Sequence, residues 1–219
     1  MKLLNKKILR KKKLFKLNIF HKSSRTNIIK NKYYSKSQSF NALFHMVQFK
    51  NVNFRGAIFT KCNFKSCVFD GVEFWGTNLK KSQFKNSRFK DCVFVGSKLE
   101  RANFKNAQFI NCTFVNMNYS NVKNLNIDMQ QNVKLNKYPA LILSNNLQHA
   151  IIDTQTNKYL SKFKLLFLNN KKINMLNVFL LLKHFSENDL ISRLLYSKAK
   201  ISFDIPTVKS LINFMQHKN

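Results

Sequence analysis

Acidic residues are scarce in this sequence. It contains 9 Asp and Glu residues against 39 Lys and Arg residues, a formal net charge of +30 over 219 residues. Such an excess indicates an anionic partner, namely nucleic acid, an acidic protein or an anionic membrane, because the charges otherwise repel one another. An AT-rich genome, which inflates the lysine content, is the alternative source. The acids show no paired arrangement, and we find no glycine-rich phosphate loop or Ser-His or Cys-His set. We therefore expect no enzyme and no small-molecule substrate.

Cysteine is scarce as well, and its spacing excludes a familiar kind of site. The four cysteines are Cys62, Cys67, Cys92 and Cys112. No two of them have the short spacing of zinc ligands, and no histidine lies near any pair. We expect buried free thiols in a reducing compartment, with no metal and no cofactor.

Long apolar runs are missing, and the longest one in the later part of the chain covers residues 178–182. That is too short to cross a bilayer. Residues 1–20 contain no long uncharged apolar stretch, so we expect no secretory signal and a soluble cytoplasmic protein. Residues 1–40 hold 13 Lys and Arg and no acid. A mitochondrial location is the alternative, if this basic N-terminus is a presequence.

The sequence does contain a repeat with a period of five. A large apolar residue stands at every fifth position, without an insertion, from Phe44 to Tyr119. A smaller residue, such as Ala42 or Cys62, precedes each of them by two positions, and the other three positions are mostly polar. A period of five fits neither a helix nor a strand. It predicts a solenoid, whose units bury their apolar side chains against copies of themselves.

The repeat resembles the pentapeptide-repeat family, whose units read approximately Ala-Asp/Asn-Leu/Phe-X-X, in the triplets VNF, CNF, TNL and ANF. This resemblance covers residues 42–121 and implies a right-handed β-helix with four sides. Gly56, Gly76 and Gly96 support four sides independently, because each is separated from the next by four fives, the length of one four-sided coil. We predict a mainly β protein with a basic N-terminal arm (1–41), a quadrilateral β-helix of about four coils (42–127), a connector (128–158) and a small all-α C-terminal domain (159–219).

Residues separated by the length of one coil should stack, and one face then carries six cations with only amides between them. We call these six the cationic ladder: Lys61, Lys65, Lys81, Lys85, Arg101 and Lys105. We predict that the ladder binds the phosphates of a polyanion such as RNA or DNA, with residues 1–36 as an accessory arm that includes Lys11, Lys12 and Lys13. A solvated face with splayed lysines is the alternative.

If the ladder face is counted as the first face and the others follow along the chain, the third face carries an apolar strip, made of Trp75, Val93, Val95 and Val115. An exposed apolar strip on a soluble protein usually has a cover. From residue 159 onward the apolar residues follow helical spacing, Ser186 is a candidate N-cap, and Pro206 can open a last helix. We expect three or four helices that pack on the strip, with a second chain as the other candidate cover.

Two further functions are consistent with the sequence. Many pentapeptide-repeat proteins have no assigned biochemistry, so a protein–protein scaffold is the main alternative to polyanion binding. The resemblance also implies a gyrase-binding mimic of DNA, but such mimicry needs an acidic rod. Residues 41–121 instead hold 12 basic and 4 acidic residues, a net charge of +8, which argues against mimicry. The sequence alone identifies neither the partner nor the oligomeric state.

Overall fold

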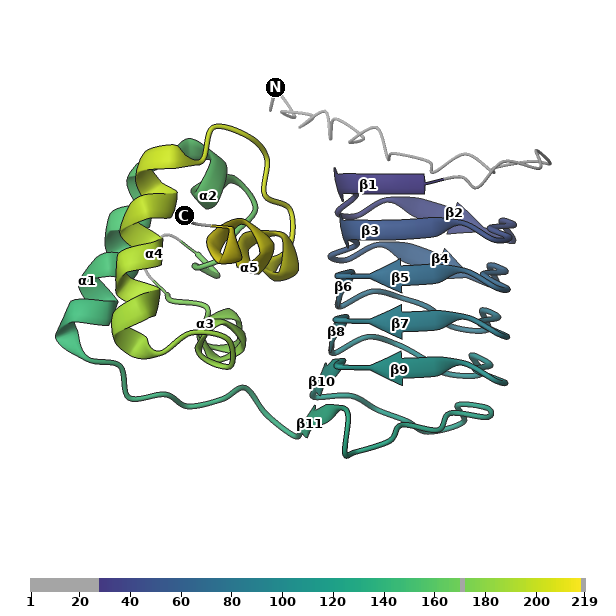
Figure 1. Cartoon of the computed structure of the whole chain (residues 1–219). Helices are drawn as coiled ribbons and strands as arrows, with labels where there is room; N and C mark the ends of the chain where they lie inside the picture. Colours follow the sequence, from purple (N-terminus) through teal and green to yellow (C-terminus); the bar gives the residue numbers. More distant parts are fainter. Residues whose placement is uncertain (1–27, 170–171, 218–219) are drawn as a thin grey trace, which may run out of the picture.

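The computed structural model describes residues 28–169 and 172–217 of the chain. Its strands stack into a column, and its helices lie against one side of that column (Figure 1). The strands are β1 (Ile28–Tyr33), β2 (Gln38–Phe40), β3 (Gln48–Asn53), β4 (Ile58–Thr60), β5 (Val68–Asp70), β6 (Glu73–Trp75), β7 (Arg88–Lys90), β8 (Val93–Val95), β9 (Gln108–Ile110), β10 (Thr113–Val115) and β11 (Val133–Leu135).

The strands are parallel, and paired residues are separated by four pentapeptides. Phe69 lies opposite Phe89 in the β5–β7 pair, and Phe94 lies opposite Phe114 in the β8–β10 pair. This register is that of a β-solenoid in which each coil contains four pentapeptides. The predicted pentapeptide-repeat β-helix is therefore confirmed, while its right-handed winding stays a prediction.

The large residues of the repeat form the core of the solenoid. The side chains from Phe44 to Phe114 in this series are buried, and only the last member, Tyr119, is partly exposed. The rings of successive coils stack almost in parallel: the centroids of Phe64 and Phe84 are 5.1 Å apart at an interplanar angle of 1°. Several rings within one coil meet edge to face, such as Phe59 and Phe64 at 86°, which is the other favourable arrangement for aromatic pairs. The repeat thus builds ordered ring columns along the axis.

The smaller residues of the repeat satisfy backbone groups inside the solenoid. The hydroxyl of Thr77 donates to the carbonyl of Phe54 at 2.9 Å, and the thiol of Cys67 donates to that of Phe44 at 2.8 Å. Serines at equivalent positions make the same bond to a carbonyl of the preceding coil. This role explains why Cys, Ser and Thr share one position, since each combines small size with a donor.

Every corner of the solenoid has a residue in the left-handed region. Positive φ recurs at every fifth residue from Asn31 (+53°) to Asn121 (+60°). Asn and Gly are common at these positions because they tolerate that conformation better than other residues. Gly76 and Gly96 belong to this set, with φ of +58° and +53°, which explains their spacing.

The solenoid is longer than the sequence indicated. It has about five coils rather than about four, because β1 pairs with β3 at one end and β11 pairs with β10 at the other. Residues 28–41, which we assigned to the basic arm, instead form β1 and β2. The register slips at Asn124, which lies exposed with φ of +53°, and it is restored where Val133 pairs with Thr113.

The C-terminal part is helical, and it begins earlier than residue 159. The helices are α1 (Asn145–Asp153), the 3-10 helix η1 (Thr154–Thr156), α2 (Lys158–Lys162), α3 (Met175–Leu182), α4 (Glu187–Lys200) and α5 (Val208–Gln216). Ser186 caps α4 as predicted, because its side chain accepts from the amide of Asp189. We did not predict α1, which lies within the expected connector. Among the described helices, none has the length and apolar character that a membrane crossing requires.

Candidate functional site

The six residues of the cationic ladder lie on one face of the solenoid, and all are exposed. Parallel bridges join Asn63 to Gln83 and Gln83 to Asn103, so the three coils of this face are aligned. Each cation therefore has its equivalent one coil above or below, at a strand spacing of about 4.8 Å. The structure brings these predicted residues together in two columns along the two edges of the face.

One column of the ladder occupies the left-handed corners of the solenoid. The φ angle is +59° at Lys61, +61° at Lys81 and +58° at Arg101. This conformation costs a residue with a Cβ about 1–2 kcal/mol. The equivalent positions of the other three corners, within residues 31–121, hold mainly Asn and Gly, with Lys36 as the one cation. Cations thus gather in one corner although its backbone does not favour them.

The amides between the two columns hold the turns of this face. The side-chain oxygen of Asn63 accepts from the amide of Lys65 at 3.0 Å, and that of Asn103 accepts from the amide of Lys105 at 3.1 Å. These bonds show that the asparagines satisfy backbone groups of the turns. They also fix the backbone from which the second column of cations projects.

Within the described residues, no ladder side chain belongs to an ion pair. Three of the four acids of residues 42–121 lie on other faces, since Asp70 pairs in register with Lys50 and Lys90, and Glu73 and Asp91 contact α5. Glu100 is the nearest in effect. Its carboxylate lies 2.6 Å from the ammonium of Lys80. The hydrogen bond from Lys80 and the charge of Lys80 lower the pKa of Glu100, and the charges of Arg101 and Lys81 lower it further. The ladder is therefore a positive face without ion pairs of its own, and the ionised Glu100 at its edge is paired with Lys80.

The predicted contribution of the arm lies mostly outside the described residues. Lys11, Lys12 and Lys13 fall within residues 1–27, which the structure does not describe. Lys30, Lys32 and Lys36, in contrast, are exposed on the first described coil. They add positive charge at the N-terminal end of the solenoid.

The apolar strip lies under the helical domain. Trp75, Val93, Val95 and Val115 are each at most 5% exposed, and they share one apolar cluster with buried residues of the helices. In Figure 1 the helices lie beside the stacked strands β6, β8 and β10, which carry the strip. The cover is therefore intramolecular, and the strip is not available to a partner while the domain is docked.

Sequence reasoning missed Glu73, which lies beside the strip and is 2% exposed. Its carboxylate accepts from the Asn53 amide at 2.7 Å and from the backbone amide of Val208 at 2.6 Å. Burial raises the pKa of Glu73 to about 7, against the opposing effects of Val208, Arg55 and Asn53. The sequence did contain a signal for this residue, because Glu73 is an acid on the face of the apolar strip, which we expected to be covered.

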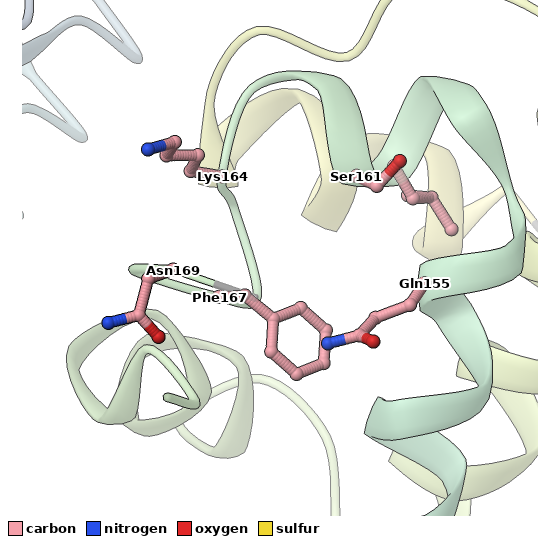
Figure 2. A pocket seen from close by; sticks show the side chains of 6 residues that line it. Gln155, Ser161, Lys164, Phe167 and Asn169 are labelled. Atoms are coloured by element: carbon pink, nitrogen blue, oxygen red, sulfur yellow. The ribbon is translucent and has the colours of Figure 1, made fainter. Parts of the chain in front are cut away.

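A pocket of about 290 Å³ lies in the helical domain (Figure 2). The amide of Gln155 lies beside the ring of Phe167, while the Lys164 side chain points away from it. The groups that line this pocket do not converge on a common point. Among the described residues, no group of three or more His, Cys, Asp or Glu side chains is placed to hold a metal ion.

The four thiols are buried in the solenoid, as the pentapeptide spacing predicted. Burial raises the pKa of Cys62 to about 11 and that of Cys67 to about 12. Both groups are therefore protonated at neutral pH, and they are poor nucleophiles in that state. Their role in the structure is to donate to inner carbonyls.

Comparisons with solved structures find other solenoids of this kind. A pentapeptide repeat protein from the thylakoid lumen of Arabidopsis thaliana is 18% identical, with 43% of this chain and 69% of that chain covered and a TM-score of 0.35. HetL from Nostoc sp. strain PCC 7120, involved in heterocyst differentiation regulation, is 11% identical, with 41% of each chain covered and a TM-score of 0.33.

Full-length QnrB1, a plasmid-mediated fluoroquinolone resistance protein, is 14% identical, with 57% of this chain and 90% of that chain covered and a TM-score of 0.20. No curated protein sequence matches the chain. Because these TM-scores are below 0.5, we take the fold from the strand register and not from these likenesses. The model of the pentapeptide repeat region matches residues 42–99 and 62–137. These matches identify residues 42–137 of the chain as a pentapeptide repeat region.

Proposed function

We propose that this protein is a non-enzymatic binding protein whose cationic ladder contacts the phosphates of RNA or DNA. The observation that carries the proposal is the uncompensated charge of one face, where Lys65, Lys85 and Lys105 and their three partners have no acid among them. A lysine-rich genome would scatter cations over all faces and all corners. Concentration in one face and one corner column is instead what selection for an anionic ligand would produce.

The conformational cost of the corner column supports the same proposal. Lys61, Lys81 and Arg101 stand where Asn or Gly would lower the free energy of the fold. Side chains in sparsely populated backbone regions often mark functional sites, because their strain is tolerated for a purpose other than stability. Repulsion along the column adds a cost of roughly 0.8 kcal/mol for two charges about 5 Å apart in water before screening. A ligand that carries regularly spaced phosphates would remove this repulsion.

The face favours contacts to the backbone of the nucleic acid over contacts to bases. Its outward residues are cations and amides, while the phenylalanines of the repeat are buried in the core. Base stacking by aromatic side chains, which is typical of single-strand binding proteins, is therefore not built into this face. Contacts to phosphates position a nucleic acid without reading its sequence. We expect little sequence specificity.

Charge reversal of one ladder column tests the proposal. The variant Lys65→Glu, Lys85→Glu, Lys105→Glu changes only exposed side chains, so the solenoid should fold normally. The matched control reverses the same number of charges on the neighbouring face: Lys50→Glu, Arg88→Glu and Lys90→Glu, which are also exposed. Binding to labelled RNA and DNA of mixed sequence is measured for both variants at one salt concentration.

We expect the ladder variant to lose at least tenfold more affinity than the control, because three phosphate contacts become three repulsions. Equal losses in the two variants would mean that only net charge matters, and the ladder would be a solvated wall. Equal retention of heparin and anionic vesicles by the wild type would extend the ligand class to polyanions in general. No retention of any polyanion would favour the protein–protein scaffold.

A further inference from the structure

The N-terminal end of α5 is held against the third face of the solenoid by a carboxylate and an amide. The amide of Asn53 donates to the carbonyl of Pro206 at 2.9 Å and to the Glu73 carboxylate at 2.7 Å. The same carboxylate accepts from the backbone amide of Val208, the first residue of α5, at 2.6 Å. Asn53 and Glu73 belong to successive coils, so two coils of the solenoid form hydrogen bonds with the start of α5, at Pro206 and Val208.

The next residue of α5 is also held closely. The ammonium of Lys209 lies 3.0 Å from the carboxylate of Asp91. A Cβ added at Gly71 would lie 2.8 Å from Cγ of Lys209 and 2.7 Å from the side-chain oxygen of Asn51. Helix α5 thus packs directly on the backbone of Gly71. It cannot shift here without breaking the contacts of Lys209 with Gly71 and Asp91.

Glu73 differs from the other acids of this contact because its environment changes completely when the domain undocks. It is 2% exposed in the docked structure. It precedes the inward-facing Phe74, so its own side chain points outward from the solenoid and would meet solvent if α5 were removed. The carboxyl is therefore dehydrated only in the docked state.

The charged groups around Glu73 come from several elements. Arg55, which follows β3, acts on it most directly, and its guanidinium also lies 4.3 Å from the centroid of the Trp75 ring. The Asp91–Lys209 pair joins the solenoid to α5. His184, after α3, has its pKa lowered by burial and by Lys209. Within the described chain, Arg55 is the one cation that acts on the Glu73 carboxylate, and no ion pair joins the two side chains.

We propose that Glu73 makes docking of the helical domain pH-dependent, with the docked domain retaining a proton that the undocked domain releases. A protonated carboxyl is neutral, so its burial under α5 costs less than burial of the anion. Oε1 then serves as the carbonyl oxygen that accepts from Val208, and Oε2 carries the proton while a lone pair on it still accepts from the Asn53 amide. Loss of the proton leaves a dehydrated charge under the helix and weakens the contact.

The direction follows from proton linkage. Burial raises the pKa of Glu73 from its ordinary value of 4.5 to about 7 in the docked state. Docking is therefore strongest when the pH is below the pKa of 4.5 in the undocked state. It weakens as the pH rises through the pKa of about 7 in the docked state. A shift of this size makes the docking equilibrium constant fall by about one to two orders of magnitude between pH 5 and pH 8.

Hydrogen exchange of the α5 amides in the full chain tests this proposal. After correction for the intrinsic exchange rate, protection in the wild type should fall by about one to two orders of magnitude between pH 5 and pH 8 if exchange requires undocking. In Glu73→Gln, which cannot titrate, protection should stay constant over that range. In the control His184→Gln, the wild-type dependence should remain. The single tryptophan, Trp75, is buried in the contact, so its emission reports whether each variant is docked.

A second neutral variant, Glu73→Val, introduces the residue that Val93 provides at the paired position one coil away. It is needed because the side-chain NH₂ of glutamine can face the NH₂ of Asn53, which donates to Glu73 in the wild type. Constant protection in each neutral variant that keeps docked Trp75 emission supports the proposal. Flat protection in the wild type, retained pH dependence in Glu73→Gln, or its loss in His184→Gln would overturn it. Undocking of both neutral variants at pH 5 would also overturn it, because the proposal requires a neutral Glu73 at that pH.

Discussion

The first and third faces of the solenoid share one backbone design and one core, yet they have opposite surfaces. Outward positions of the first face hold Lys65, Lys85 and Lys105, all exposed and without an ion pair in the described chain. Outward positions of the third face hold Trp75 and Val95, both buried under helices. The comparison teaches that the inward residues specify the solenoid, while the outward residues decide what each face binds.

The two faces also differ in how their charges are compensated. On the third face the carboxylates of Glu73 and Asp91 meet Val208 and Lys209 of α5. On the first face the cations have no such partner among the described residues. The third face is covered by the helices of the same chain, while the first face is exposed in the described structure.

The largest effect should come from the core that both faces share. Phe94 is 1% exposed and stacks on Phe74 and Phe114. We expect Phe94→Ala to lower the free energy of unfolding by about 3–5 kcal/mol, because it leaves a cavity in the ring column. Denaturant unfolding measures this loss. Phe94→Leu is the control and should cost much less, since Leu79 and Leu99 fill equivalent positions. A loss below about 1 kcal/mol for alanine would contradict the stacked core.

An exchange of residues between the faces should have a smaller and unequal effect. Val95→Lys places a charge under the helical domain and should cost about 3 kcal/mol, the size typical of an unpaired buried charge. Lys85→Val changes an exposed side chain and should alter the free energy of unfolding by at most about 0.5 kcal/mol. Thermal or denaturant unfolding of both variants gives the two numbers. Similar costs would remove the distinction between a covered and an open face.

A smaller effect should separate two glycines of the corners. Gly71 and Gly76 both have positive φ, so alanine should cost about 1 kcal/mol at either for that reason alone. At Gly71 the new Cβ would also press on Lys209 and Asn51, whereas nothing lies within 4 Å at Gly76. We expect Gly71→Ala to cost about 1–3 kcal/mol more. Equal costs would show that α5 does not depend on this close approach.

The sequence predicted the solenoid because its signal is local and repeated. Each coil buries the same residue types at the same positions, so Phe64 and Phe84 could be placed without knowledge of distant segments. The corner residues were less visible, since Asn, Lys and Gly at positive φ do not share one chemical type. The ends were predicted least well. Ile29 and Tyr34 keep the period of five, but Ser39 stands where the next large residue is expected and Lys32 stands at a small-residue position, so β1 was missed.

The periodic parts of the candidate site were also predicted from the sequence, because their signal is local and repeated. Stacking at the interval of one coil placed the ladder from sequence alone, and it also revealed the apolar strip. The contact of Glu73 with Val208 joins two distant segments of the chain, and no periodic pattern connects those two positions. Tertiary docking of this kind depends on how two differently built domains fit together, so it needed the structure.

The most direct test of the central claim is the salt dependence of nucleic-acid binding by the wild type and the ladder variant Lys65→Glu, Lys85→Glu, Lys105→Glu. Each phosphate contact contributes about −0.9 to the slope of log K against log salt concentration on duplex DNA. We predict that the variant has a slope shallower by about 2–3, while the second-face control changes it by less than about 1. An unchanged slope in the ladder variant would contradict the claim that this face contacts phosphates.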